Sequence, residues 1–236
     1  MQRIFRMERI KFLKAGLGAI LLLALAALLS SCRLYTVVRL EKNADAGQEV
    51  KVYFDNNAFD ADKYVDAIWE KKVVPYILAK AVDVRLVIPE LKKGTDAAGS
   101  KYGIRDSAEG SPWNFIVKGR GRIVAVHTVS RNGTVDLDLP PYDNQPDLKI
   151  QIGPVIKGTS IRDTLNFISF DDFENQIEFA RLANAFNLRI YNQILSKLNF
   201  ESLKDKEVEF DGTFTADGSG ALMIVPVRVA PVGGGE

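Results

Sequence analysis

A change of hydrophobic period at residue 113 most limits the folds that this chain can adopt. From Trp113 to Ser130 apolar and polar residues alternate, which predicts a strand, and Asn132-Gly133 then supplies residues that tolerate the positive φ angles of a hairpin. Four later segments also have strand patterns, and a long helical pattern separates the third strand from the fourth. The five predicted strands are residues 113–130, 134–139, 148–156, 207–214 and 221–229.

Three strands, a helix and two strands follow the element order of an OB-fold, a five-stranded Greek-key barrel. We therefore predict an α+β protein with a small antiparallel OB-like β-barrel, spanning residues 113–232, and a long helix between strands 3 and 4. Gly119 and Gly121 interrupt the first strand near its start, where a strongly coiled strand needs residues without a side chain. A plain α+β sandwich has the same order of elements, so the order alone leaves both architectures open.

The long helix is expected to start at Asp171, which forms a capping-box pattern with Glu174. Apolar residues then recur at three- and four-residue steps, so one side of the helix is expected to face the core. The residues of that side are Ile177, Ala180, Asn184, Leu188, Tyr191, Leu195 and Leu198.

Residues 51–112 are expected to form a helical subdomain followed by a long loop. A helical apolar rhythm starts after Asp60, which is placed to cap the first turn, and Pro75 interrupts it before it resumes. Residues 92–112 carry four glycines and Pro112 among polar residues, which predicts the loop.

The first 31 residues have the pattern of a lipoprotein signal peptide. Five basic residues precede an uncharged run from Ala15 to Leu29, and the run ends in Leu29-Ser30-Ser31-Cys32, a lipobox. Acyl chains on Cys32 would hold residues 32–50 to the membrane as a tether. An uncleaved transmembrane anchor is the alternative. The lipoprotein interpretation is preferred because the chain's one cysteine stands where the processing requires it.

The expected location is the cell envelope, with the protein lipid-anchored and facing the periplasm. Arg33 follows the lipidated cysteine in place of the aspartate that is associated with inner-membrane retention, which favours the outer membrane over the inner. Loss of the signal peptide lowers Lys and Arg from 31 to 26 and Asp and Glu from 30 to 29, leaving a net charge of −3. This mildly acidic balance argues against nucleic acid as a partner.

The stretch IQIGPVIKGTSIRD, residues 150–163, approaches the glycine spacing of a phosphate-binding loop. Such a loop needs a lysine directly after the second glycine, but Thr159 follows Gly158, and Pro154 lacks a backbone donor. We therefore predict the end of a strand at a glycine turn, followed by a short helical segment from Ser160.

Other catalytic sets are excluded by the inventory of side chains. His127 is the only histidine, so it has no histidine partner for a metal site, and acylation of Cys32 removes the only cysteine nucleophile. Carboxylates crowd the start of the long helix, where the helix dipole favours them; a divalent cation is the alternative explanation. These carboxylates belong to Asp171, Asp172, Glu174 and Glu178. We expect no cofactor, no metal and no catalytic residue.

Several stretches together resemble DUF2291, a family of predicted periplasmic lipoproteins. They are Phe59 to Val65 with Ile68-Trp69 and Val74-Pro75, Gly110 to Trp113, Ile150 to Thr159, Ile161 to Asp163, and Asp172-Phe173 with Asn175 to Phe179. The resemblance covers nearly all of the mature chain. It implies no established activity, but members of the family are often encoded beside sugar-type ABC importers, which implies a role near carbohydrate uptake.

Two functions remain open at this stage. In the first, the barrel surface binds a small saccharide or a component of an ABC transporter without catalysis, as OB barrels bind oligosaccharides. The candidate contact residues are Trp113, Arg120, Gly153, Pro154, Arg162, Asp163, Asn175 and Gln176. In the second, the protein is an envelope carbohydrate hydrolase that pairs Asp163 with Asp172 or Glu174. The first function is preferred, and the glycine turn and the start of the long helix are expected to lie close together.

Overall fold

The structure is a computed structural model that describes residues 59–233, except for 107–109 and 219–221. All of the described residues lie in one compact unit that begins at Asp55. The predicted signal peptide, the tether and Cys32 lie outside the described residues. Within the described part of the chain, no helix is both long enough and apolar enough to span a membrane.

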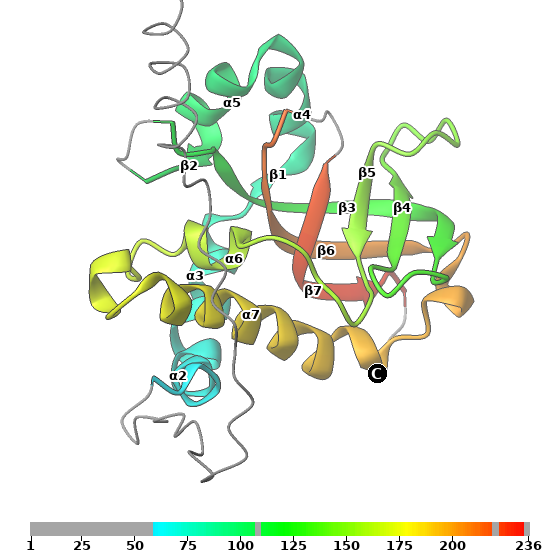
Figure 1. Ribbon diagram of the computed structural model, residues 1–236. Coiled ribbons are helices and arrows are strands. Elements are labelled where there is room, and N and C mark those ends of the chain that lie inside the picture. Colours follow the sequence, from blue (N-terminus) through cyan, green and yellow to red (C-terminus); the bar gives the residue numbers. More distant parts are fainter. Residues whose placement is uncertain (1–58, 107–109, 219–221, 234–236) are drawn as a thin grey trace, which may run out of the picture. The chain divides into compact units, whose positions relative to one another are not determined.

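Five strands form a closed barrel (Figure 1). They are β3 (Asn114–His127), β4 (Thr134–Asp138), β5 (Leu148–Gln151), β6 (Glu207–Thr215) and β7 (Met223–Pro231). The order around the barrel is β3, β4, β5, β7 and β6, and β6 pairs with β3 to close it. This confirms the predicted OB-like barrel. One pair departs from the antiparallel prediction, because β7 runs parallel to β5 after the chain has crossed over through the helix.

The first barrel strand, β3, is long and bends. It pairs with β6 from Asn114 to Arg122 and with β4 from Arg122 to His127, so the same strand serves two parts of the barrel wall. A Cβ atom on Gly119 would lie 2.8 Å from the Phe210 ring, and one on Gly121 would lie 2.9 Å from the Asp138 carbonyl oxygen. Gly119 therefore leaves room for the Phe210 ring and Gly121 lets β4 approach closely, which fits the coiled strand expected from the sequence.

Short helices precede the barrel. They are α2 (Ala61–Ile68), the π-helical turn η1 (Trp69–Val73), α3 (Val74–Lys80), α4 (Val84–Lys93) and α5 (Thr95–Tyr102). Asp60 caps α2 as predicted, because its carboxylate accepts a hydrogen bond from the Lys63 N–H at 3.0 Å. The π-helical turn directly precedes α3, whose second residue, Pro75, has no N–H to continue regular helical bonding. Two-residue strands, β1 (Val82–Asp83) and β2 (Gly103–Ile104), join this helical part to β3.

The prediction of a continuous loop over residues 92–112 is wrong, because α5 and β2 lie within it. Gly94, with a φ of 144°, separates α4 from α5, but Gly99 and Gly103 make room for a neighbouring side chain. A Cβ atom on Gly99 would lie 2.2 Å from the indole ring of Trp113, and one on Gly103 would lie 2.8 Å from the same ring. The helix therefore tolerates Gly99, which costs about 1 kcal/mol of helix propensity, because only glycine leaves space for the tryptophan.

The long helix α7 (Gln176–Gln193) starts later than predicted. Its N-cap is Asn175, whose side-chain oxygen accepts hydrogen bonds from the N–H groups of Ile177 and Glu178 at 2.9 and 3.0 Å. The expected capping role of Asp171 is therefore wrong. A separate capping box forms between Ser169 and Asp172 around the 3-10 turn η2 (Phe170–Asp172). Because Asn175 itself supplies the cap, the helix begins after this turn and not at Asp171.

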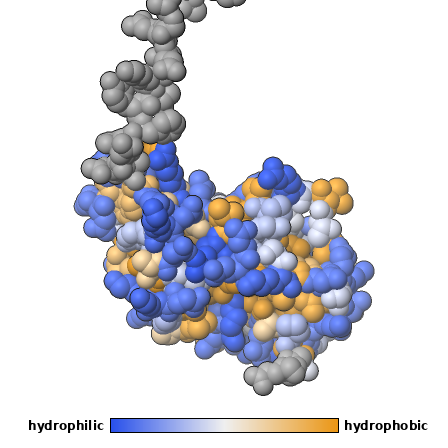
Figure 2. All heavy atoms as spheres, turned by 90° about the horizontal axis from the view of Figure 1, so that it is seen from below, coloured by the Kyte–Doolittle hydropathy of each residue, from blue (hydrophilic) through white to orange (hydrophobic). Residues whose placement is uncertain are grey.

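The predicted core-facing side of α7 is also wrong in part. Ile177 and Leu188 are 65% and 50% exposed. Figure 2, which views the molecule from below, shows apolar groups between hydrophilic ones on the surface. Apolar residues occur on more than one side of this helix, so periodicity alone does not select the buried side. Packing selects the side that carries Leu182, Phe186 and Ile190, which are fully buried; the Phe186 ring lies 6.2 Å from the Trp69 ring.

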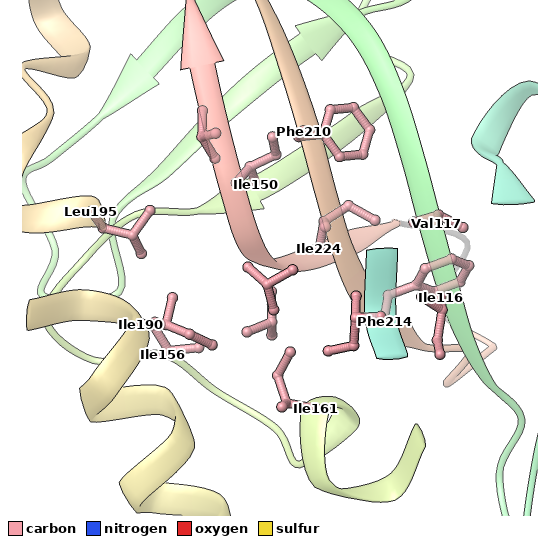
Figure 3. Close-up of a cluster of buried hydrophobic side chains, with 14 of the residues drawn as sticks. Ile116, Val117, Ile150, Ile156, Ile161, Ile190, Leu195, Phe210, Phe214 and Ile224 are labelled. Carbon is pink, nitrogen blue, oxygen red and sulfur yellow. The ribbon is translucent and has the colours of Figure 1, made fainter. Parts of the chain in front are cut away.

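The core fills the barrel and continues to α7, which crosses beneath it (Figures 1 and 3). Phe115 and Phe214 stack inside the barrel with ring centroids 4.9 Å apart. Three further short helical segments are α6 (Ser160–Thr164), which packs against β3 and β6, η3 (Leu195–Lys197), which follows α7, and η4 (Phe200–Leu203), which packs against β3. Figure 3 shows Ile161 and Ile190 pointing toward the barrel from α6 and α7. Each such buried side chain contributes about 1.5–3 kcal/mol to folding.

Candidate functional site

The glycine turn that follows β5 is held from both sides by backbone and side-chain hydrogen bonds. The strand ends at Gln151, earlier than the predicted Ile156, and the N–H of Gly153 donates to the Gly133 carbonyl at 3.1 Å. A Cβ atom on Gly153 would lie 2.2 Å from the Arg131 carbonyl oxygen. This glycine is therefore needed because the β3–β4 hairpin loop approaches closely, and not because a phosphate does.

Two buried amide side chains engage the remaining polar backbone of the turn. The Gln151 side chain accepts from the Lys157 N–H at 2.7 Å and donates to the Lys157 carbonyl at 3.0 Å. Asn187 on α7 donates to the carbonyls of Ile156 and Gly158 at 3.3 and 3.0 Å. The most recognisable stretch of the sequence thus joins the barrel to α7, which agrees with the exclusion of a nucleotide site there.

Arg162 and Asp163 on α6 form a compact polar pair beside an aromatic ring. The Arg162 guanidinium lies 3.6 Å from the centroid of Phe179, donates to the Phe179 carbonyl at 2.9 Å and donates through Nε to Asp163 at 2.7 Å. The second carboxylate oxygen of Asp163 accepts from the Thr159 hydroxyl at 2.5 Å. The side chain of Arg162 is only 11% exposed, so its position is fixed by the protein.

This pair lies at the edge of a hollow of about 450 Å³, here named the Arg162 hollow. One wall comes from residues 104–106 and 111–114, and the other from residues 162–170 and Phe179. The polar residues that line it are Arg105, Asp106, Ser111, Asn114, Arg162, Asp163, Asn166 and Ser169. Phe170 also lines it and is 41% exposed, so a partly open aromatic ring stands beside amide, carboxylate and guanidinium groups. The volume is within the range of small-molecule sites.

Trp113 supports this hollow from behind. Its indole N–H donates to Asp96 at 2.8 Å, and the Arg105 guanidinium lies 4.2 Å from the centroid of its ring. Trp113 itself does not line the hollow. It orients Arg105, which does line the hollow. Its role in the structure is therefore to position a lining residue through a cation–π contact.

The other predicted contact residues lie elsewhere. Arg120 pairs with Glu207, which also accepts from the Tyr142 hydroxyl. These partners, first the Tyr142 hydroxyl and then Arg120, lower the pKa of the Glu207 carboxyl. Gly153 and Pro154 line a different hollow of about 440 Å³ next to the β3–β4 hairpin loop. Asn175 caps α7, and Gln176 is exposed in its first turn. The eight candidates thus occupy several places, and only Arg162 and Asp163 line the Arg162 hollow.

Residues that sequence reasoning missed make up most of the hollow. Asn114, Asn166 and Phe170 have no motif around them, and Arg105 and Asp106 lie in the segment that was predicted as a loop. The two walls are separated by about fifty residues of sequence, and the barrel brings them together through β3 and α6. Only the long predicted loop gave a signal, because such loops often carry function.

The carboxylates near the start of α7 are engaged in local contacts. Asp172 accepts from the Ser169 N–H at 2.8 Å, and Glu178 accepts from the Glu174 N–H at 3.1 Å. Neither Asp172 nor Glu174 lines the Arg162 hollow with Asp163. Among the residues that the structure describes, no group of three or more His, Cys, Asp and Glu side chains is placed to hold a metal ion.

His127 belongs to a polar cluster on the outside of the barrel. Its Nε2 atom lies 3.1 Å from Asp136, and the Lys149 ammonium donates to the other oxygen of the same carboxylate at 2.5 Å. The three residues come from β3, β4 and β5, and they link neighbouring strands. This arrangement fits the structural role that a single strand histidine most often has.

The Asp136 cluster predicts a specific pH dependence. Burial opposes the ionisation of Asp136, but hydrogen bonds from Lys149 and His127 outweigh it and hold the pKa of this carboxyl below its usual range. A lowered pKa stabilises the folded chain above the unfolded-state pKa of about 4, and this contribution is lost as the pH falls through the folded-state pKa. Asp136→Asn should therefore flatten the acid side of a plot of urea midpoint against pH. An acid limb as steep as that of the parent chain would contradict this assignment.

Comparison with known proteins places the chain in two ways. The family of predicted periplasmic lipoproteins DUF2291 matches residues 22–230. The crystal structure of an OB-fold protein from Thermotoga maritima is similar, with a TM-score of 0.60, 18% sequence identity, and coverage of 73% of this chain and 98% of that one. At this identity the likeness establishes the fold alone. No curated protein sequence matches the chain.

Proposed function

Because the chain belongs to the DUF2291 family of predicted periplasmic lipoproteins, we propose that it is a non-catalytic accessory protein of the cell envelope that binds a small saccharide in the Arg162 hollow. Lipid on Cys32 would hold it to the membrane, with the folded part facing the periplasm. The outer membrane is favoured over the inner because Arg33 follows the cysteine. One observation carries the binding proposal, namely that the exposed Phe170 ring stands among convergent hydrogen-bonding groups in the Arg162 hollow.

The chemistry of the hollow suits an uncharged, polyhydroxylated ligand. Two guanidinium groups, Arg105 and Arg162, and two carboxylates, Asp106 and Asp163, line it, so their charges balance. Amide, carboxylate and hydroxyl groups offer both donors and acceptors to sugar hydroxyls. An aromatic ring offers an apolar face to the C–H groups of a sugar. A strongly anionic ligand is disfavoured, because the two carboxylates would repel it and the hollow has no surplus of positive charge.

The alternative function, a carbohydrate hydrolase with paired carboxylates, has less support. Such enzymes place two carboxyl groups across the scissile bond, one of them with a raised pKa. Both oxygens of Asp163 are already engaged, by Arg162 and by Thr159. Neither Asp172 nor Glu174 lines the same hollow, where Asp106 is the other carboxylate among the lining residues. The binding function is therefore the one that the geometry favours.

A thermal-shift experiment tests the binding proposal. The purified protein is heated with a panel of neutral mono- and disaccharides, with sugar acids as the charged comparison. A bound sugar at about a hundred times its Kd should raise the Tm by about 5 °C or more, since this saturation stabilises the fold by about 2.7 kcal/mol. The neutral sugars should give the shift, and the sugar acids should not.

Matched variants locate the site. Phe170→Ala should weaken binding of the active sugar about tenfold, because the stacking face is lost. Leu86→Ala removes a similarly exposed apolar side chain on α4, outside the hollow, and should leave binding unchanged. If no sugar shifts the Tm, or if both variants bind like the parent protein, the saccharide proposal is wrong.

The link to uptake is a second part of the proposal. Members of the DUF2291 family are often encoded beside sugar-type ABC importers, so a component of such an importer is the expected protein partner. Co-purification of the importer with the membrane-bound full chain, strengthened by the sugar that shifts the Tm, would support it. Saccharide binding without importer association would confine the role to binding.

A further inference from the structure

A further hollow of about 430 Å³ lies between α4 and the adjacent ends of β6 and β7 (Figure 1). We name it the Lys92 hollow. The end of α4, the start of α5, the loop between β4 and β5, and the residues that follow β6 and precede β7 form its walls. No residue lines both this hollow and the Arg162 hollow. Its volume is also within the range of small-molecule sites, so the fold provides a second, separate place for a ligand.

The inner surface of the Lys92 hollow is apolar. Ile88, Leu91, Ala216 and Leu222 line it, and these half-buried side chains pack against the hydrophobic core. Backbone hydrogen bonds fix the part that the barrel contributes. The Ala216 N–H donates to the Trp113 carbonyl at 2.9 Å, and the Leu222 carbonyl accepts from a backbone N–H of β5 at 2.8 Å. The apolar surface is therefore formed by the fold before any ligand arrives.

The rim of the hollow carries charges of both signs. Lys92 on α4 and Asp147 before β5 both line it and are exposed. The described residues offer the Lys92 ammonium no ion-pair partner, whereas the neighbouring Lys93 pairs with Glu90. Asp147 accepts from the Leu139 N–H through Oδ2 at 2.7 Å, which fixes the carboxylate, but no described residue donates a hydrogen bond to its Oδ1. An ammonium and a carboxylate oxygen thus remain available to a ligand.

Opposite charges beside an apolar surface select the class of ligand. A simple amine would be repelled by Lys92, and a simple carboxylic acid would be repelled by Asp147 and by Asp217, which also lines the hollow. A zwitterion instead gains a charge-assisted hydrogen bond at each of its two groups. We propose that the Lys92 hollow binds a free amino acid with a large apolar side chain, which lies against the apolar surface.

This site is distinct from the proposed saccharide site, although the two hollows share a structural link. The Thr215 hydroxyl, which lines the Lys92 hollow, donates to Asn114 Oδ1 at 2.6 Å, and Asn114 lines the Arg162 hollow. The groups that would hold the amino acid take no part in the Arg162 hollow. The proposal therefore does not depend on saccharide binding.

Titration calorimetry of the purified full chain tests the proposal with ligands that share one carbon skeleton. Leucine carries both charged groups, isopentylamine carries only the ammonium, and isocaproate carries only the carboxylate. Leucine should bind at least about tenfold more tightly than either analogue, because each analogue loses one charge-assisted hydrogen bond and meets a repelling charge. Glycine, a zwitterion without a side chain, should also bind at least about tenfold more weakly, because it buries no apolar surface.

Matched variants locate the amino acid. Lys92→Gln should weaken leucine binding about tenfold and should remove the preference for leucine over isopentylamine. Lys80→Gln changes an exposed lysine at the end of α3, outside the hollow, and should leave binding unchanged. Asp147→Asn keeps an acceptor for the Leu139 N–H but removes the charge, so it should narrow the preference for leucine over isocaproate. Unchanged Tm values without ligand show that the variants are folded.

Several results would overturn the proposal. They are no binding of leucine or phenylalanine, equal binding of leucine and its two analogues, and Lys92→Gln that binds leucine like the parent chain. Loss of leucine binding in Phe170→Ala would also overturn it, because the amino acid would then occupy the Arg162 hollow. Lys92→Gln should leave the sugar-dependent Tm shift unchanged, so the saccharide proposal and the amino acid proposal fail separately.

Discussion

Gly153→Ala is expected to destabilise the protein by about 3 kcal/mol or more, at the upper end of the cost of overpacking. The added Cβ atom would lie 2.2 Å from the Arg131 carbonyl oxygen and 2.3 Å from the Gly133 nitrogen. Both are backbone atoms of the β3–β4 hairpin loop, so the collision cannot be relieved by rotating a side chain. The loop and the turn must separate, which breaks the hydrogen bond from Gly153 to Gly133. Urea unfolding measures the loss of free energy.

Gly158→Ala in the same turn is the matched control. Gly158 has a φ of 94°, but nothing lies within 4 Å of its Cβ position. The substitution therefore adds backbone strain without a collision and should cost only about 1 kcal/mol. If Gly153→Ala costs no more than Gly158→Ala, the turn is not held by the close approach of the hairpin loop.

Asp138→Ala is expected to cost about 3 kcal/mol, because it removes a fully buried carboxylate from its partners. Asp138 at the end of β4 accepts from Arg122 at 3.1 Å and from the N–H groups of Asn144 and Asp143 at 2.9 and 3.4 Å. Loss of these acceptors leaves two partly buried backbone donors without their partner and frees the loop that follows β4. Arg122 is 30% exposed and regains some contact with water, which places the cost at the lower end of the range for buried ion pairs.

A carboxylate whose cationic partners are exposed provides the comparison. Glu90 on α4 pairs with Lys93 and Lys101 at 3.0 and 3.2 Å, and both lysines are more than half exposed. Glu90→Ala should change the urea midpoint little, since solvent screens pairs whose lysine ends are exposed. A double-mutant cycle of Asp138→Ala with Arg122→Ala should show coupling, and its absence would assign the whole effect to the two backbone donors.

The order of the barrel elements was predictable because each strand carries its own local signal. Alternation in β3, the turn chemistry of Asn132-Gly133 and the glycines at 119 and 121 each depend on a few neighbouring residues. The parallel pairing of β5 with β7 was not predictable in this way. It depends on where the chain returns after α7, which no local pattern records.

The errors share one physical cause, namely that tertiary contacts decided between local alternatives. Gly99 and Gly103 read as loop residues because nothing in their own segment shows that Trp113 occupies the space beside them. Ile177 and Leu188 read as core residues because periodicity cannot tell which apolar side of a helix meets a neighbour. Asp171 and Asn175 are both good caps, and the 3-10 turn between Ser169 and Asp172 decided which one starts α7.

The candidate site was predictable only where it overlapped a recognisable motif. Arg162 and Asp163 follow the glycine turn, and they line the Arg162 hollow. Phe170, Asn166 and Asn114 also line it, but they come from segments that meet only in the folded chain. A single sequence does not show that these two segments come into contact, because neither segment carries a recognisable motif.

The parallel pairing between β5 and β7 has a consequence for the way the barrel is assembled. It joins only two residue pairs, Lys149 with Met223 and Ile150 with Ile224, whereas β3 and β6 pair along nine. The paired residues are 74 positions apart in the chain. Their pairing therefore costs the entropy of closing a long loop and gains only a few hydrogen bonds. During folding this seam should therefore close late, after α7 has packed, and in the native state it is where the barrel opens at the lowest cost.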